Sequence, residues 1–274
     1  HRQAKGDPTL SWGWDLVDAM TGGLRPGLYL VGARPQVGKT TFVQQVATYI
    51  AQDRAVLFVS AEMPALDLGD RHLASLTRSE VRDLWRGQYG EDLWGKLQEG
   101  IAGLSELGIW WFAGRGMTSV DVRARAQEVN ARSDKPLGLV VVDYLQLLAD
   151  REGENRNTQV ENISRRLKTL AMEMRVPMLV ASQLRRASEF RADTRPTLSD
   201  LRDSGALEQD ADIVLLLYRP ELTYSEDWWV KNHPDLPYPR GELHLLLAKN
   251  RWLGNAGQGS ILHWQRHGKY SESP

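Results

Sequence analysis

The sequence has 274 residues, a hydrophobic fraction of 42% and a formal net charge of −1, from 34 Lys plus Arg against 35 Asp plus Glu. This composition excludes an intrinsically disordered chain, and the length fits one large globular domain or two small ones. The sequence contains no cysteine, which excludes disulfides, thiolate catalysis and cysteine-bound zinc. No apolar run approaches the roughly 18 residues that span a bilayer, so we expect a cytoplasmic protein without a membrane partner. Because the net charge is near zero, any contact with nucleic acid has to come from local sites.

Short β-type runs alternate with helical patterns along most of the chain, which is typical of a mostly parallel α/β fold. Five runs are almost continuously apolar, as expected for strands covered by helices on both faces of a sheet: 28–31, 56–59, 137–142, 178–181 and 213–217. Apolar residues at three- and four-residue spacing predict an amphipathic helix over 158–175. Two later runs, 242–248 and 260–264, alternate more and are expected to form antiparallel or edge strands. We interpret residues 1–8 as the remnant of a linker and expect one domain over 9–274.

A phosphate-binding loop is predicted at residues 33–40 (ARPQVGKT), between the first apolar run and an amphipathic helix. Gly38 lets the backbone curl so that successive N–H groups point inward, and the start of the helix adds positive potential for a phosphate. Lys39 is expected to reach the β- and γ-phosphates, and the Thr40 hydroxyl to ligate Mg²⁺. The alternative is a turn with a solvent-exposed lysine, which the strand and helix on either side disfavour.

Hydrolysis of a bound nucleotide needs a second carboxylate on the magnesium side and a group that orients or deprotonates the attacking water. Asp143 ends the third apolar run, as in a Walker B strand. Glu62 follows the second run, at the end of a strand expected beside that of the phosphate loop; its position fits equally a charge at the start of a helix. Gln183 follows the fourth run and is a candidate sensor of the γ-phosphate or an ordinary loop residue. The predicted nucleotide-binding residues are Arg34, Pro35, Gln36, Val37, Gly38, Lys39, Thr40, Thr41, Asp143 and Gln183, with Thr40 and Asp143 as the metal ligands.

A series of short motifs resembles, in composition and order, those of the motor domain of the DnaB family of replicative helicases. The motifs are 20–27 (MTGGLRPG), 32–35 (GARP), 60–64 (SAEMP), 143–148 (DYLQLL), 182–184 (SQL), 198–205 (LSDLRDSG) and 248–251 (AKNR). The resemblance runs from about Pro8 to Trp264. The sequence matches the motor domain alone, as expected of a fragment of such a helicase or of a shorter phage or plasmid relative.

The resemblance implies a RecA-like P-loop ATPase that uses ATP and Mg²⁺. It implies assembly into a homohexameric ring around one DNA strand, movement from 5′ to 3′, and primase or a helicase loader as partners. Glu62 would be the catalytic base, acting with Lys39. Lys249 and Arg251 correspond to the family's finger residues, which reach the γ-phosphate held by the neighbouring subunit; without the family they read as solvated charges at the end of an edge strand.

The resemblance also assigns the contacts with DNA to loops that line the central channel. The matching positions are Arg202, Asp203, Ser204 and Gly205, and the loop 150–157 is a second candidate. A backbone N–H at Gly205 can approach a phosphate closely while Arg202 supplies charge, which predicts binding without sequence preference.

Two other functions remain as alternatives. A RecA-type strand-exchange recombinase has the same core and a DNA-stimulated ATPase, and a regulatory RecA-like module binds ATP with little turnover. The helicase-like motifs disfavour the first, and the paired carboxylates Glu62 and Asp143 disfavour the second. The aromatic-rich segment 219–241 carries no motif; we expect local packing of an extended loop there rather than a surface that stacks bases. His263 and His267 are spaced four apart but are not expected to bind a metal, because their segment reads as strand and turn.

Overall fold

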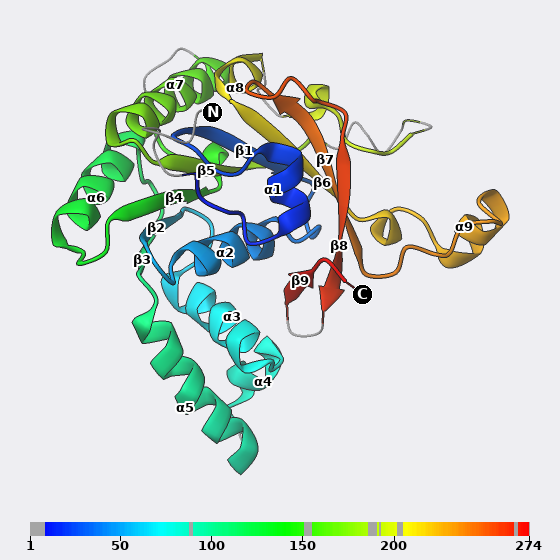
Figure 1. Cartoon of the computed structure of the whole chain (residues 1–274), viewed down its shortest axis with the longest axis horizontal. Helices are drawn as coiled ribbons and strands as arrows, with labels where there is room; N and C mark the ends of the chain where they lie inside the picture. The colour runs from blue at the N-terminus through cyan, green and yellow to red at the C-terminus, as the bar shows by residue number, and fades with distance from the viewer. Residues whose placement is uncertain are drawn as a thin grey trace.

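The computed structural model describes residues 9–87, 90–150, 155–185, 191, 193–201, 205–265 and 268–273. Its centre is a nine-stranded sheet with the strand order β3-β2-β4-β5-β1-β6-β7-β8-β9 (Figure 1). The parallel strands are β1 (Gly27–Ala33), β2 (Ala55–Ser60), β3 (Ile109–Ala113), β4 (Leu137–Asp143), β5 (Pro177–Gln183) and β6 (Ile213–Tyr218). The antiparallel strands are β7 (Glu242–Asn250), β8 (Gly259–Gln265) and β9 (Lys269–Ser271). The predicted mixed sheet is therefore confirmed.

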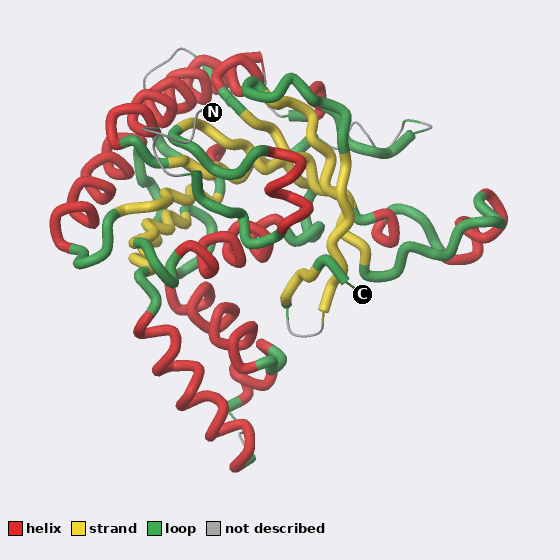
Figure 2. The backbone as a smooth tube through the Cα atoms, in the orientation of Figure 1, coloured by secondary structure: helices red, strands yellow, loops and turns green. Residues whose placement is uncertain are grey.

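Helices cover both faces of this sheet (Figure 2). They are α1 (Asp15–Thr21), α2 (Lys39–Ile50), α3 (Ala65–Thr77), α4 (Val81–Arg86), α5 (Glu91–Glu106), α6 (Ser119–Arg132), α7 (Arg156–Met174), α8 (Gly205–Asp210) and α9 (Glu226–Asn232). Successive residues of a strand point to opposite faces, so Tyr29 and Val31 of β1 join one apolar core with α2, while Leu28 and Leu30 join the other with α6 and α7. No described helix is long and apolar enough to cross a membrane.

The predicted helix over 158–175 is α7. Asn155 caps its start by accepting a hydrogen bond from the Thr158 N–H at 3.0 Å, and Arg175 ends it in the left-handed region with φ +56°. The face with Val160 and Leu167 is fully buried, as the spacing predicts.

Two expectations about elements are wrong. The strand β2, which precedes Glu62, does not lie beside β1, because β4 and β5 are inserted between them. Adjacency along the chain does not fix adjacency in a sheet whose crossover helices lie on both faces. The segment 219–241 is not simply an extended loop: it contains a 3₁₀ turn (Pro220–Leu222) and the helix α9.

Candidate nucleotide-binding site

The loop between β1 and α2 has the form that a phosphate site needs. Gly38 has φ +105°, and Gln36 also adopts a positive φ of +66°. A side chain at Gly38 would place its Cβ 2.2 Å from the Tyr270 hydroxyl, so position 38 needs glycine for space as well as for conformation. The helix α2 begins at Lys39, directly after the loop, so its unpaired N–H groups and its dipole face the same place.

Lys39, Thr40 and Asp143 come together at the carboxyl ends of β1 and β4. The Thr40 hydroxyl donates to Asp143 Oδ2 at 2.6 Å, and Lys39 Nζ lies 3.7 Å from Asp143 Oδ1. Asp143 is 1% exposed, and its Oδ1 accepts no hydrogen bond from the described residues. Burial lowers the pKa of Lys39, while the carboxylates of Asp143 and Glu62 act in the opposite direction. A buried carboxylate oxygen beside a hydroxyl is the donor set that suits Mg²⁺.

Glu62 and Gln183 face the same cleft, which has a volume of about 440 Å³. Glu62 is held on a turn in which the Ser60 hydroxyl bonds both the N–H and the carbonyl oxygen of Met63, at 3.0 and 2.9 Å. Gln183 ends β5, which pairs directly with β1, and its N–H donates to Gln146 Oε1 at 3.3 Å. Although β2 is remote from β1 in the sheet, its carboxyl end opens at the same edge, and this brings Glu62 to the cleft.

The far wall of the cleft comes from residues that the sequence analysis did not select. Arg219 follows β6 and lies over the ring of Trp264 from β8, 5.5 Å from its centroid. Arg71 of α3 and Tyr144 also line the cleft. An aromatic ring with a guanidinium over it offers a flat surface for a nucleobase. Tyr144 lies in the motif 143–148, but Arg219, Trp264 and Arg71 lie in none, and the first two reach the cleft from strands far along the chain.

Tyr270, which is likewise absent from the predicted site residues, supports the phosphate loop. Its hydroxyl donates to the Val37 carbonyl at 3.2 Å, and the side chain is 1% exposed. Gln45 of α2 fixes its backbone twice: the amide nitrogen donates to the Tyr270 carbonyl at 2.7 Å, and the amide oxygen accepts from the Tyr270 N–H at 2.8 Å. The strand β9 is thereby joined to both the loop and the helix that follows it.

Lys249 and Arg251, the predicted finger residues, lie at the opposite edge of the sheet. Asn250, between them, pairs with Ile213 at the start of β6, whereas Leu217 near its end pairs with Ala33. The length of a strand, about 3.3 Å per residue, therefore separates Arg251 from the phosphate loop of its own chain. Burial lowers the pKa of Lys249, and the neighbouring Arg251 adds to this effect.

The predicted DNA contacts are only partly visible. Arg202, Asp203 and Ser204 lie outside the described residues, as do 151–154 of the second candidate loop. Gly205 is exposed at the start of α8, with open space where a side chain would be. Arg156 of the second loop is turned inward, and its guanidinium donates to the carbonyls of Gln146 and Leu148.

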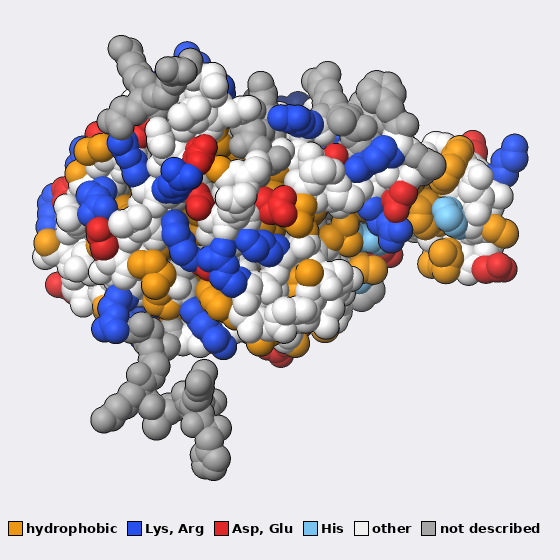
Figure 3. Space-filling view, turned by 90° about the horizontal axis from the view of Figure 1, so that it is seen from above, with side chains coloured by type: hydrophobic (Ala, Val, Ile, Leu, Met, Phe, Trp, Pro, Cys, Tyr) orange, Lys and Arg blue, Asp and Glu red, His pale blue; other side chains and the backbone are white. Residues whose placement is uncertain are grey.

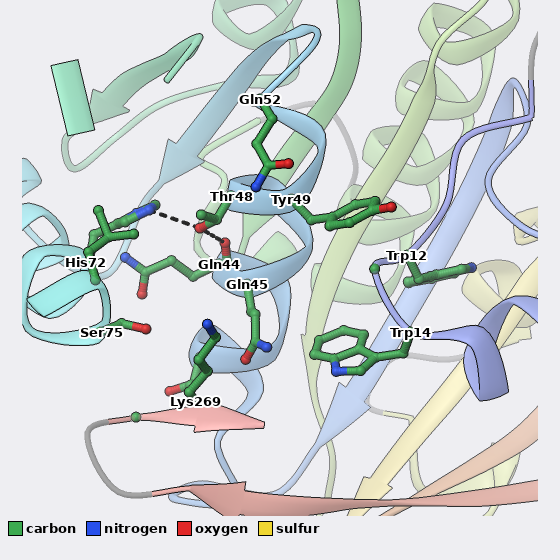
Figure 4. Close-up of a pocket in the computed structure, with 14 residues that line it drawn as sticks. Trp12, Trp14, Gln44, Gln45, Thr48, Tyr49, Gln52, His72, Ser75 and Lys269 are labelled. Atoms are coloured by element: carbon green, nitrogen blue, oxygen red, sulfur yellow. Dashed lines mark hydrogen bonds between the residues drawn. The ribbon is translucent and has the colours of Figure 1, made fainter. Parts of the chain in front are cut away.

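A separate hollow of about 230 Å³ lies farther along α2, between that helix, α3 and the segment that carries Trp12 and Trp14 (Figure 4). His72 lines it and bonds Thr48 through Nε2 at 2.9 Å. Its lining contains no carboxylate and no phosphate loop, so it is not the nucleotide site. Within the described residues, no group of three or more His, Asp or Glu side chains could hold a metal ion, and His267 lies outside them.

Comparison with known proteins gives one consistent answer. The profile of the DnaB-like helicase C terminal domain matches residues 9–272. The chain is 37% identical over 272 residues to the replicative DNA helicase DnaC of Bacillus subtilis (strain 168), covering 97% of this chain and 57% of that protein. It is 41% identical over 225 residues to the replicative DNA helicase DnaB of Pasteurella multocida (strain Pm70), covering 80% and 48%. The chain thus spans about half the length of the curated relatives it matches.

The solved structures agree with the sequences. One solved ATPase domain superimposes with a TM-score of 0.85 at 30% identity, covering 97% of this chain and 92% of that one. A DnaB-like replicative helicase, solved in a study of its interactions with primase, gives 0.84 at 32% identity, covering 98% and 64%. The RadB recombinase gives 0.56 at 17% identity, which shows the shared RecA-type fold alone. The chain belongs to the DnaB-like helicase C-terminal domain family.

Proposed function

We propose that this chain is an ATP-driven motor domain that assembles head to tail into a homohexameric ring and moves 5′ to 3′ along single-stranded DNA. The observation that carries this proposal is the convergence of the phosphate loop, Asp143 and Glu62 on one cleft. A RecA-type recombinase would have the same core, but the family membership of the chain favours the motor.

In this proposal the cleft takes ATP with Mg²⁺. The backbone N–H groups of residues 34–38 and the Lys39 ammonium bind the phosphates, while Thr40 and Asp143 hold the metal ion. Bound Mg²⁺ supplies the positive charge that the transferring phosphoryl group needs. The buried Oδ1 of Asp143, which lacks a hydrogen bond within the described residues, supports a ligand at this point. The flat surface of Trp264 and Arg219 is the proposed site for the adenine base.

Glu62 is the proposed catalytic base. Its side chain is exposed to the cleft, so a water molecule can lie between it and the γ-phosphate and give up its proton to the carboxylate. Gln183, at the tip of β5, is the proposed sensor, which would bond the γ-phosphate and respond to its loss; its position in the lining of the cleft supports this. Lys249 and Arg251 complete the site of a neighbouring subunit, because they lie at the edge opposite to their own cleft.

The DNA contacts proposed for the ring are Arg202, Asp203, Ser204 and Gly205 of each subunit. Two cations that precede them are already paired within the subunit: Arg191 with Asp200, and Arg195 with Asp193 at 2.8 Å. Several copies facing one channel add their charges, so we expect weak binding by a monomer and salt-sensitive binding by the ring. Primase or a helicase loader are the proposed protein partners.

The test is ATP hydrolysis with and without single-stranded DNA, measured for the wild type, Glu62→Gln and Glu106→Gln. We expect Glu62→Gln to keep nucleotide binding and to lower turnover at least about 100-fold, because it removes the proton acceptor. Glu106→Gln is the same change at an exposed position at the end of α5 and should behave as wild type. Unchanged turnover in Glu62→Gln would remove Glu62 from the mechanism.

A further inference from the structure

The segment that joins β6 to β7 stands off from the rest of the molecule. We call residues 220–241 the arm. It contains a 3₁₀ turn (Pro220–Leu222) and the helix α9, and it extends well beyond the carboxyl end of β6 (Figures 1 and 2). None of the residues of α9 is buried. The arm is joined to the body at its base, where the Tyr224 hydroxyl bonds Thr194 at 2.9 Å, but α9 buries none of its own residues and is available to contact something else.

The arm nevertheless has a defined structure of its own. The rings of Tyr224 and Trp228 stack with centroids 4.3 Å apart and planes 10° from parallel. Trp229 Nε1 donates to the Pro237 carbonyl at 3.0 Å, and the Tyr238 hydroxyl donates to the Tyr224 carbonyl at 2.9 Å. Because the ring stacking and these hydrogen bonds hold the arm in one shape, binding to a partner would order few further groups.

Apolar side chains are exposed on this small surface. Val230 and Leu236 are each 56% exposed, Leu222 is 52% exposed and Trp228 is 42% exposed. Figure 3 shows hydrophobic and histidine side chains on the surface of the arm, which projects at the right of the view. Single exposed apolar residues are ordinary, but several on one projecting segment are typical of a contact surface.

The arm leaves the body beside the nucleotide cleft. Its first residues, with Arg219, line a hollow of about 310 Å³ together with residues 34–37 of the phosphate loop. The parallel strands β1 and β6 end together at this edge, and the arm continues in the direction in which they run (Figure 1). In a head-to-tail ring this edge faces the next subunit, so the arm extends past the nucleotide toward that subunit.

We propose that the arm is a subunit contact that docks on the opposite edge of a second copy of this chain, beside Lys249 and Arg251. This inference rests on the proposed head-to-tail assembly and adds a contact to it. The two surfaces are different, so the interface is heterologous, the kind that gives a ring when the rotation between neighbouring subunits closes.

The charges and apolar groups of the two surfaces are complementary. The arm is acidic overall: it carries Glu221, Glu226, Asp227 and Asp235 against Lys231 and Arg240, and Arg240 pairs with Glu226 at 2.6 Å. On the opposite edge, Lys168 and Arg251 both pair with Asp212, and Lys249 donates to the carbonyls of Glu208 and Gln209. Figure 3 shows Lys and Arg side chains gathered over α7 and α8, in this part of the molecule. Leu253 beside them is 49% exposed and offers an apolar contact.

Single-stranded DNA fits the arm less well than a second copy does. Part of the surface that could stack on bases is already covered within the arm, since Tyr224 stacks on one face of Trp228 and His233 packs against Trp229 with centroids 4.6 Å apart. The carboxylates of α9 would also repel phosphates. These features favour a protein surface as the partner.

The absence of cysteine from the sequence allows a direct test by cross-linking. Val230→Cys places one thiol on the arm, and Leu253→Cys places one on the opposite edge. With ATP and Mg²⁺ at concentrations where the chain assembles, the double variant treated with a short bis-maleimide should give a ladder of covalent oligomers. Each single variant should give none, because the two thiols of one contact come from different surfaces.

Val120→Cys with Leu253→Cys is the matched control, since Val120 is 61% exposed on α6, away from the arm. Three results would overturn the contact. The control could give an equal ladder, or Val230→Cys alone could form a dimer. Single-stranded DNA could also protect the Val230→Cys thiol while the double variant gives no ladder. If the double variant assembles into rings but gives no ladder of covalent oligomers, the arm contact is overturned and the proposed motor is unaffected. A wild type that neither assembles nor hydrolyses ATP would overturn both.

The contribution of the arm to assembly can be measured separately. Val230→Ser with Leu236→Ser should raise the protein concentration needed for half-assembly on the order of tenfold. The nucleotide affinity of the monomer should stay at the wild-type value, because neither residue lines the cleft. Unchanged assembly in this variant would also contradict the proposal.

Discussion

His72 is a buried titratable residue whose protonation state follows from its contacts. It is 1% exposed, and burial lowers its pKa from 6.5 to about 4. The Thr48 hydroxyl donates its only proton to the Gln44 carbonyl at 2.8 Å, so the His72 Nε2–H must donate to Thr48 Oγ1 at 2.9 Å. Nδ1 is then unprotonated and has no hydrogen-bond partner within the described residues. His72 is therefore neutral in the folded protein at neutral pH.

The lowered pKa predicts an acid-sensitive fold. Between pH 6.5 and about 4 the unfolded chain binds a proton at His72 that the folded chain does not, so the free energy of unfolding falls as the pH falls through this range. The full effect is on the order of 3 kcal/mol, at about 1.4 kcal/mol per pKa unit. Urea unfolding at several pH values should show this slope, and His72→Gln should reduce it. An equal slope in the variant would mean that other groups cause it.

The residues of the cleft differ in how far the sequence could predict them. Lys39, Thr40 and Asp143 lie in motifs whose neighbours along the chain fix their surroundings, and the structure brings them into contact. Trp264 reaches the cleft, and Tyr270 reaches the phosphate loop beneath it, only because the chain returns there through β8 and β9. Nothing in their local sequence indicates this, since the contact depends on the order of the strands.

At the scale of elements, the C-terminal hairpin β8–β9 stabilises the nucleotide loop. Tyr270 bonds Val37, Gln45 fixes the Tyr270 backbone, and Trp264 packs edge-on against Tyr270 with centroids 5.1 Å apart. Since the hairpin also supplies Trp264 to the wall of the cleft, it contributes both to the shape of the loop and to the surface proposed for the base.

We expect Tyr270→Phe to weaken ATP binding about two- to twelvefold, because one hydrogen bond contributes about 0.5–1.5 kcal/mol. The ring stays in place, so turnover at saturating ATP should remain near the wild-type value. Steady-state ATPase kinetics should show a raised KM for ATP and an unchanged kcat. Tyr49→Phe is the control, because Tyr49 lies on α2 and is 46% exposed. Equal KM values for Tyr270→Phe and the wild type would show that the loop holds its shape without this bond.

The sequence predicts a helix or strand correctly where burial requires an apolar run or a helical period of apolar residues. The apolar runs of β1, β2, β4, β5 and β6 and the periodicity of α7 identify these elements correctly. The strand β9 was missed because it has three residues, and α9 because it packs on no core that would impose a period. The position of β2, with β4 and β5 between it and β1, follows from packing of the whole sheet and has no local signal.

At the scale of the molecule, the central feature is that the nucleotide cleft and the pair Lys249 and Arg251 lie at opposite edges of one sheet. In the proposed ring, a complete site takes the phosphate loop and Glu62 from one chain and Lys249 and Arg251 from another. Hydrolysis should depend on assembly, because a trans arginine contributes about 10³- to 10⁵-fold in related phosphoryl-transfer enzymes.

Mixing two inactive variants tests this arrangement. Arg251→Ala keeps Glu62, and Glu62→Gln keeps Arg251, so some junctions in mixed rings contain both groups. The ATPase rate of the mixture should exceed the summed rates of the separate variants. Arg25 is a nearby exposed cation, so Arg25→Ala is the control: it should hydrolyse ATP without being mixed with another variant. Mixed oligomers that form but restore no hydrolysis would mean that Arg251 does not act across the interface.

The most direct test of the motor is strand separation on a forked DNA duplex with ATP and Mg²⁺, at protein concentrations that drive assembly. We predict unwinding that requires a free 5′ tail and is lost in Glu62→Gln. A duplex that stays paired while assembled wild-type protein hydrolyses ATP, or unwinding that requires a 3′ tail instead, would contradict a 5′ to 3′ motor.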